Sequence, residues 1–140
     1  MRVAVDARPA AFGRRTGVGV YVDELLRRLP NADPESTFVA WHLDARRALG
    51  GPRAFDDIAA SNFVERSTPV PARWFDRLAR ATGIPRIEWL TRFDVLLAPN
   101  FVPPPTRTDR LVLTVHDLAF RRMPETAPAS TLRWLSGFDA

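Results

Sequence analysis

The fold is decided by residues 1–43, which read MRVAVDARPAAFGRRTGVGVYVDELLRRLPNADPESTFVAWHL. Val3-Ala4-Val5 is a short apolar run, typical of a strand buried on both faces. A glycine-containing loop follows, and then apolar residues recur with the period of a helix at Val18, Val22, Leu25, Leu26 and Leu29. Pro30 is expected to end this helix. Thr37 to Leu43 is rich in branched and aromatic residues and predicts a second strand, parallel to the first.

The rest of the chain continues this alternation. We predict strands at 63–66, 94–98 and 111–115, the last two buried, and helices at 44–49, 72–82, 84–92 and from Ser130 onward. Gly83 closes one of these helices, and Pro85 occupies the first turn of the next. The pattern predicts an α/β fold with an open, mostly parallel sheet and helices on both faces.

Composition narrows the class of protein. The chain of 140 residues has the length of one domain, and its 20 basic residues are all arginine, with a net charge of +4. The absence of cysteine excludes disulfide scaffolds and thiolate zinc sites, and two histidines far apart in sequence offer no metal-ligand spacing. Acidic residues are interspersed with the arginines, so the charge alone does not indicate a nucleic-acid partner. No segment suits a membrane span or a signal peptide, and we expect a cytoplasmic protein.

Polar side chains follow three of the predicted strands. Asp6 comes after the first, Asn100 after the strand at 94–98, and His116-Asp117 after the strand at 111–115. Ligands of open α/β sheets bind outside the carboxyl ends of the strands. This coincidence predicts a site at that edge, without identifying the ligand.

The glycine loop and the two histidines are further candidates for ligand binding or catalysis. Thr16-Gly17-Val18-Gly19 opens a helix, whose unpaired N–H groups attract phosphate, but the same residues suit a tight turn and a helix cap. Arg14-Arg15 would aid a phosphate or simply keep the loop solvated. The imidazole of His116 would hydrogen-bond a sugar hydroxyl, act as a base, or only satisfy a loop. His42 lies within a strand, where packing is the usual role.

A third group is the basic stretch Arg73, Arg77 and Arg80, spaced at i, i+4 and i+7 opposite Trp74, Leu78 and Ala81. Such a stretch suits the surface of an anionic membrane. The alternative interpretation is a solvated arginine face above a stripe of core residues.

Three motifs together resemble the family 4 glycosyltransferases. The first comprises Arg2 to Pro9 (RVAVDARP) and Arg15 to Val22 (RTGVGVYV) with the Leu-Leu-Arg-Arg-Leu helix. The second is Asp94 to Asn100 (DVLLAPN), and the third is Thr114 to Phe120 (TVHDLAF) followed by Met123-Pro124-Glu125. They occur in the family's order and cover residues 1 to about 125.

The resemblance implies the N-terminal, acceptor-side Rossmann-like domain of a GT-B enzyme. Such enzymes transfer a hexosyl or mannosyl unit from a GDP-, UDP- or dTDP-sugar with retention of configuration, and they require no cofactor or metal. By the same resemblance His116 and Asp117 would be catalytic, and the loop of Gly17 and Gly19, with Thr16 and Arg15, would approach the donor diphosphate. Asn100, Tyr21 and Asp6 are expected to contact substrate.

One feature of the family is missing: the Glu-x7-Glu motif of its donor-binding domain is not found in this sequence. We therefore expect residues 1–140 to be a partial N-terminal domain, inactive alone, from a bacterial enzyme of envelope or polysaccharide biosynthesis. Its acceptor would be a saccharide or a lipid-linked one, with peripheral contact to the inner face of the membrane through Arg73, Arg77 and Arg80. The alternative is a stand-alone α/β module that binds a nucleotide or phosphorylated ligand. A nucleic-acid-binding domain is a third, weaker hypothesis that rests only on arginine content.

Overall fold

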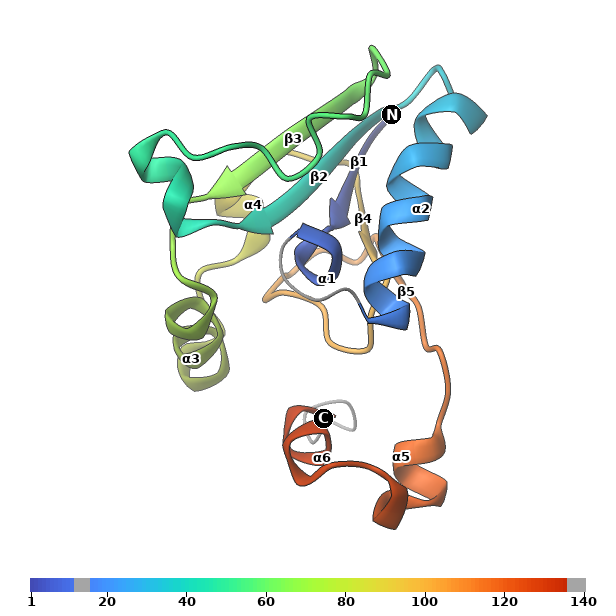
Figure 1. The fold of residues 1–140 in the computed structure, drawn as a ribbon, viewed down its shortest axis with the longest axis vertical. Coiled ribbons are helices and arrows are strands. Elements are labelled where there is room, and N and C mark those ends of the chain that lie inside the picture. Colours follow the sequence, from blue (N-terminus) through green and yellow to red (C-terminus); the bar gives the residue numbers. More distant parts are fainter. Residues whose placement is uncertain (12–15, 136–140) are drawn as a thin grey trace.

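A computed structural model of the chain describes residues 1–11 and 16–135 (Figure 1). Its five strands form one sheet in the order β3-β2-β1-β4-β5, and every neighbouring pair is parallel. The strands are β1 (Arg2–Asp6), β2 (Thr37–Leu43), β3 (Phe63–Thr68), β4 (Val95–Ala98) and β5 (Leu111–Leu113). All carboxyl ends therefore lie at one edge of the sheet. The predicted α/β class and Rossmann-like open sheet are confirmed.

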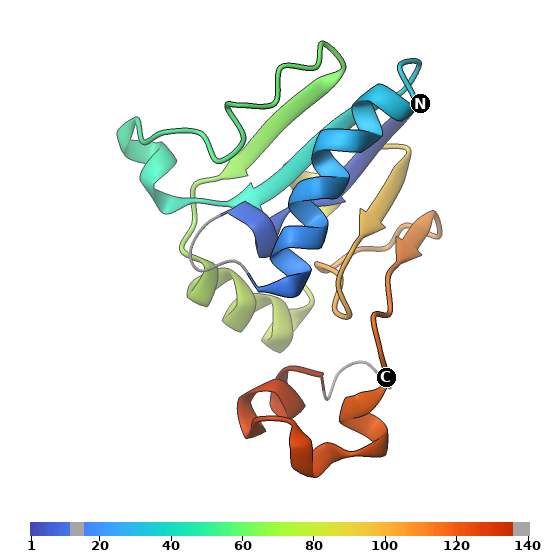
Figure 2. The same cartoon turned by 45° about the vertical axis from the view of Figure 1, so that its right-hand side comes forward.

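Helices cover both faces of the sheet. The helices α1 (Arg8–Ala11) and α2 (Gly17–Ala32) pack on one face, where Val5, Val22 and Leu26 are buried together. Figure 2 shows α2 running along this face. The helices α3 (Ala72–Thr82) and α4 (Ile87–Leu90) cover the other, where Phe75 and Ile87 pack with Trp41. Because each central strand faces apolar partners on both sides, its sequence is a continuous apolar run.

Pro30 does not end α2, contrary to the prediction. The helix continues to Ala32, and the backbone N–H of Asp33 closes it on the carbonyl of Leu29 at 3.0 Å. A proline removes one N–H and crowds the carbonyl four residues earlier, which is disruptive in the middle of a helix. Pro30 lies in the last turn of α2, so the lost hydrogen bond affects only the end of the helix.

The strand predicted at 111–115 is shorter and less buried than expected. Within residues 1–11 and 16–135 it pairs with β4 alone, and Val112 is 53% exposed. Its apolar sequence does not reveal that it lies at the edge of the described sheet. The helix predicted at 84–92 is also shorter, because α4 begins only at Ile87 and Pro85 precedes it.

The other elements agree with the sequence or add to it. The short helix predicted at 44–49 is the 3-10 helix η1 (Ala45–Leu49). Short turns of helix that were not predicted are α1, α5 (Ala119–Arg122) and η2 (Pro124–Thr126), and the final helix α6 spans Ala129–Leu135. No helix formed by residues 1–11 or 16–135 has the length and apolar character needed to cross a bilayer.

Candidate functional site

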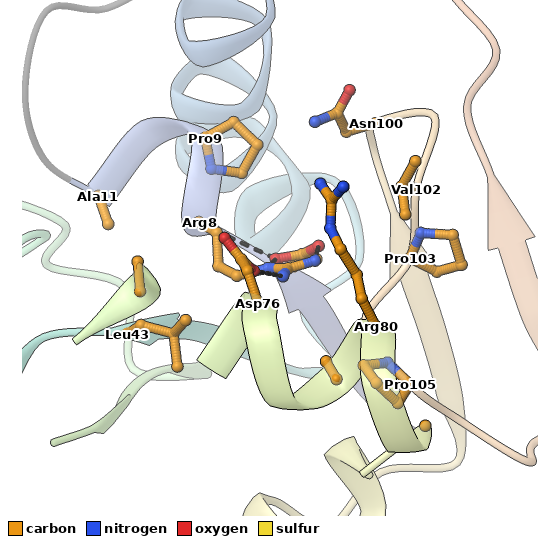
Figure 3. Close-up of a pocket in the computed structure, with 14 residues that line it drawn as sticks. Arg8, Pro9, Ala11, Leu43, Asp76, Arg80, Asn100, Val102, Pro103 and Pro105 are labelled. Atoms are coloured by element: carbon orange, nitrogen blue, oxygen red, sulfur yellow. Dashed lines mark hydrogen bonds and ion pairs between the residues drawn. The ribbon is translucent and has the colours of Figure 1, made fainter. Parts of the chain in front are cut away.

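A pocket of about 620 Å³ lies beyond the carboxyl ends of the strands (Figure 3). Asp6 and Leu43 contribute to it from the ends of β1 and β2, and Asn100 from the loop after β4. Its opposite wall is one face of α3 together with the proline-rich segment after Asn100. The sequence predicted a site at this edge, and the pocket brings together two of the predicted residues, Asp6 and Asn100.

The floor of the pocket is an ion-pair network centred on Arg8. Its Nε and Nη2 donate to the two carboxylate oxygens of Asp6 at 2.8 and 2.7 Å, and Nη1 lies 3.5 Å from Oδ1 of Asp76. The guanidinium also lies over the rings of Trp41 and Phe75, with its carbon 5.5 and 5.8 Å from the ring centroids. The backbone explains the arrangement, since β1 ends at Asp6 and α1 begins two residues later at Arg8.

This network stabilises the charged form of Arg8. Burial favours the neutral form of Arg8, but the carboxylate of Asp6 outweighs it, so the pKa of Arg8 is raised. Asp6 is 1% exposed, and both its oxygens are occupied by Arg8. In this structure Asp6 therefore holds Arg8 in place, and its predicted contact with substrate stays a prediction.

The wall formed by α3 supplies residues that were not predicted to line a pocket, including Arg80, which was expected at a membrane surface. Ala72, Asp76, Ala79, Arg80 and Gly83 line the pocket from one side of the helix. Figure 3 shows the side chain of Arg80 pointing into the pocket, toward the rim formed by Asn100. These residues recur at i, i+4, i+7, i+8 and i+11, so their spacing indicates that they share one face of the helix. The spacing does not show which way this face points, and that becomes clear only because Phe75 is buried in the core.

Asn100 offers a donor at the rim. Its Oδ1 accepts the backbone N–H of Phe101 at 2.9 Å. The amide nitrogen is then the group that Asn100 can present to a ligand.

His116 contacts the loop after β4 that carries Asn100, but it does not line the pocket. Its Nε2 is 3.1 Å from the carbonyl oxygen of Pro99, and its ring stands edge-on to Tyr21 and Phe101, at centroid distances of 5.2 and 5.7 Å. A carbonyl only accepts, so Nε2 carries a proton in this hydrogen bond. In the neutral ring Nδ1 is then an acceptor, and the residue as a whole is exposed.

The start of α2 reaches the same region. Thr16 caps the helix, because its hydroxyl oxygen accepts the N–H of Gly19 at 3.4 Å. Tyr21 follows two residues after Gly19 and touches His116, which joins the first turns of α2 to the carboxyl edge of the sheet. Gly17 is exposed, and a side chain there would meet nothing within 4 Å. Packing within the described chain does not require glycine at this position. Arg15, with Arg14, lies outside the described residues.

The remaining candidates have local structural partners. Asp117 is exposed, and its Oδ1 accepts the backbone N–H of Ala119 at 2.9 Å, which supports the turn into α5. His42 is fully buried with Nε2 at 2.9 Å from Oε1 of Glu65, as expected for a packing residue. Among the described residues no three potential metal ligands lie together.

The basic stretch of α3 does not cover a core stripe. Trp74 and Leu78, which that interpretation would bury, are 57% and 47% exposed, while Phe75 is buried. Arg73, Arg77 and Arg80 are all exposed, and Arg80 is the one of the three that also lines the pocket. The helix therefore shows solvent an apolar and basic surface of four side chains: Arg73, Trp74, Arg77 and Leu78.

Comparisons of the chain with models of known protein families, with curated proteins and with solved structures found no match. The resemblance to glycosyltransferases therefore rests on the motifs in the sequence.

Proposed function

We propose that this chain is the acceptor-side portion of a retaining glycosyltransferase that uses a nucleotide-sugar donor. The observation that carries the proposal is the convergence at one edge of the sheet. Asn100 lines the pocket at this edge. His116 does not line the pocket, but it bonds the carbonyl of Pro99 next to Asn100 and contacts Tyr21 in the first turns of α2. Open parallel sheets bind their ligands at this edge.

The chemistry available suits a carbohydrate. His116 offers an acceptor at Nδ1 and Asn100 offers amide donors, which together match the donor and acceptor character of sugar hydroxyls. Proline and valine side chains in the pocket wall suit the apolar face of a sugar ring. The start of α2 would accept the donor diphosphate, with Gly17 allowing a close approach. Sugar transfer requires the donor to be held against the acceptor. We therefore do not expect this chain by itself to catalyse the transfer.

The proposal is tested by titrating the isotope-labelled chain with methyl glycosides of glucose, mannose and galactose, and separately with UDP and GDP, followed by NMR. Saccharides should shift signals near Asn100 and His116. The variant Asn100→Ala should weaken that response, whereas Asn31→Ala on α2, outside the pocket, should not. If no saccharide perturbs the pocket in the millimolar range, the acceptor-domain assignment is wrong.

A second candidate is a stand-alone module for a nucleotide or phosphorylated ligand. The exposed, uncrowded Gly17 at a capped helix start favours it. UDP or GDP shifting residues 16–20, with no response to any saccharide, would select this candidate over the first.

Peripheral membrane contact is a further part of the proposal. The α3 surface of Arg73, Trp74, Arg77 and Leu78 combines exposed apolar groups with positive charge, the combination that binds anionic headgroups. The chain should sediment with vesicles containing phosphatidylglycerol and not with pure phosphatidylcholine. The double variant Trp74→Ala with Arg77→Gln should sediment less than the parent chain. Equal sedimentation of the parent and the double variant would refute membrane contact through α3.

A further inference from the structure

Four charged side chains line the pocket: Asp6, Arg8, Asp76 and Arg80. Three of them are paired with one another, because Arg8 bonds Asp6 through two nitrogens and reaches Asp76 through the third. Within residues 1–11 and 16–135, Arg80 forms no ion pair or hydrogen bond through its side chain. Among the residues that the structure describes, Arg80 is thus the one cation of the pocket whose donors are not committed to the protein.

Arg8 cannot take the same role. Its guanidinium is held by two carboxylates and lies over the rings of Trp41 and Phe75. Rotating it toward a ligand would leave the buried charge of Asp6 without a partner, which is costly. Arg80 has no such duty and points into the pocket (Figure 3).

The surroundings of Arg80 favour an anion. Across the pocket Asn100 contributes amide donors, while Pro9, Val102 and Pro103 contribute apolar surface and no side-chain acceptor. The nearest competing carboxylate on the same helix is Asp76, whose side chain is 51% exposed and faces Arg8. Its charge is therefore screened by solvent and by Arg8.

We propose that the pocket selects a saccharide that carries an anionic group, a carboxylate or a phosphate, and that Arg80 binds this group. The inference rests on the proposed function, since it names the class of acceptor that the pocket takes. The planar fork of a guanidinium binds carboxylate and phosphate oxygens in pairs. Asn100 donates a further hydrogen bond from the opposite rim, and the sugar ring lies against the proline and valine walls.

The experiment compares four probes on the whole chain: glucose, glucuronate, glucose 6-phosphate and inorganic phosphate. Affinity is measured by NMR titration for the parent chain and for Arg80→Gln. The matched control is Arg77→Gln, which removes the same charge one turn away on the exposed surface of α3. Unfolding in urea verifies that both variants remain folded.

Glucuronate or glucose 6-phosphate should bind at least about tenfold more tightly than glucose, since hydrogen bonds to charged groups are the stronger ones. Arg80→Gln should abolish this preference for anionic sugars over glucose, and Arg77→Gln, whose side chain does not line the pocket, should keep it. Which of the two anionic sugars binds more tightly identifies the group as carboxylate or phosphate.

Four results would overturn the inference. Equal binding of glucose and both anionic sugars removes the selectivity while leaving the acceptor-domain proposal intact. An equal loss in Arg77→Gln shows that only the general charge of α3 matters. Inorganic phosphate binding as tightly as glucose 6-phosphate shows that the sugar is not recognised. If no saccharide binds at all, the proposed function fails and this inference fails with it.

Discussion

The substitution Asp6→Asn tests whether the Arg8 network supports the pocket floor. It removes a charge that is 1% exposed and replaces one acceptor oxygen with an amide that cannot accept from Arg8. Breaking a buried ion pair on one side costs ~3–5 kcal/mol. Arg8 is partly exposed, with 22% of its side chain accessible, and keeps Asp76 at 3.5 Å, so its charge stays partly compensated. We therefore expect a loss of about 2–3 kcal/mol in the free energy of unfolding.

The assay is urea unfolding followed by circular dichroism, with Asp76→Asn as the matched control. Asp76 makes the longer contact to the same Arg8 and is half exposed, so its substitution should cost under about 1 kcal/mol. The double variant Asp6→Asn with Arg8→Met removes both charges and should be more stable than Asp6→Asn alone. A loss from Asp6→Asn no larger than that from Asp76→Asn would refute the reasoning, because the buried pair would then contribute no more than an exposed contact.

Three further predictions concern other parts of the structure. Burial alone would raise the pKa of Glu88, but hydrogen bonds, led by the hydroxyl of Thr106, lower it. The stabilisation by Glu88 is thus present above its unfolded-state pKa of about 4.3 and is lost as the pH falls through the lower folded-state value. In urea unfolding, Glu88→Gln should be less stable than the parent near neutral pH, with a difference that shrinks in acid; a constant difference would contradict this. Gly83→Ala should lower the free energy of unfolding by about 1 kcal/mol in the same assay, because Gly83 has φ +68°. Gly17→Ala should be nearly neutral, since a side chain there meets nothing within 4 Å. Equal losses would contradict the left-handed conformation of Gly83 as the cause. Nitrogen NMR of the neutral His116 ring should find the proton on Nε2, and a proton on Nδ1 would remove the assigned acceptor.

The strands could be predicted because a buried strand is recognisable from its own run of apolar residues. The element β2 matches its predicted bounds of Thr37 to Leu43, since a strand covered on both faces needs a continuous apolar run. The helix α3 also matches, because Gly83 is the left-handed residue that closes it. The edge position of β5 could not be predicted, since the number of neighbours of a strand is not encoded in its own residues.

Two residues of the pocket, Asp6 and Asn100, could be predicted in the same way. Asp6 and Asn100 follow strands of a parallel sheet, and the topology rule alone places them at the carboxyl edge. The partner of Asp6 is two residues away, but a pair at i and i+2 meets only because the chain turns from β1 into α1 at this point. That turn comes from tertiary packing of a short helix, for which the sequence gives no clear signal.

The role of Arg80 depends on a rotation of α3 that its sequence leaves ambiguous. Burying Trp74 and Leu78 would remove more apolar surface than burying Phe75 and would put the arginines on the opposite, solvated face. The structure buries Phe75 instead, against Trp41 at a centroid distance of 5.5 Å. This choice turns Arg80 toward the pocket and leaves Trp74 and Leu78 in water, a cost that the helix alone does not explain. A membrane surface that covers Trp74 and Leu78 would offset that cost, so the proposed anion selectivity of the pocket and the proposed vesicle binding of α3 both depend on the same packing of Phe75.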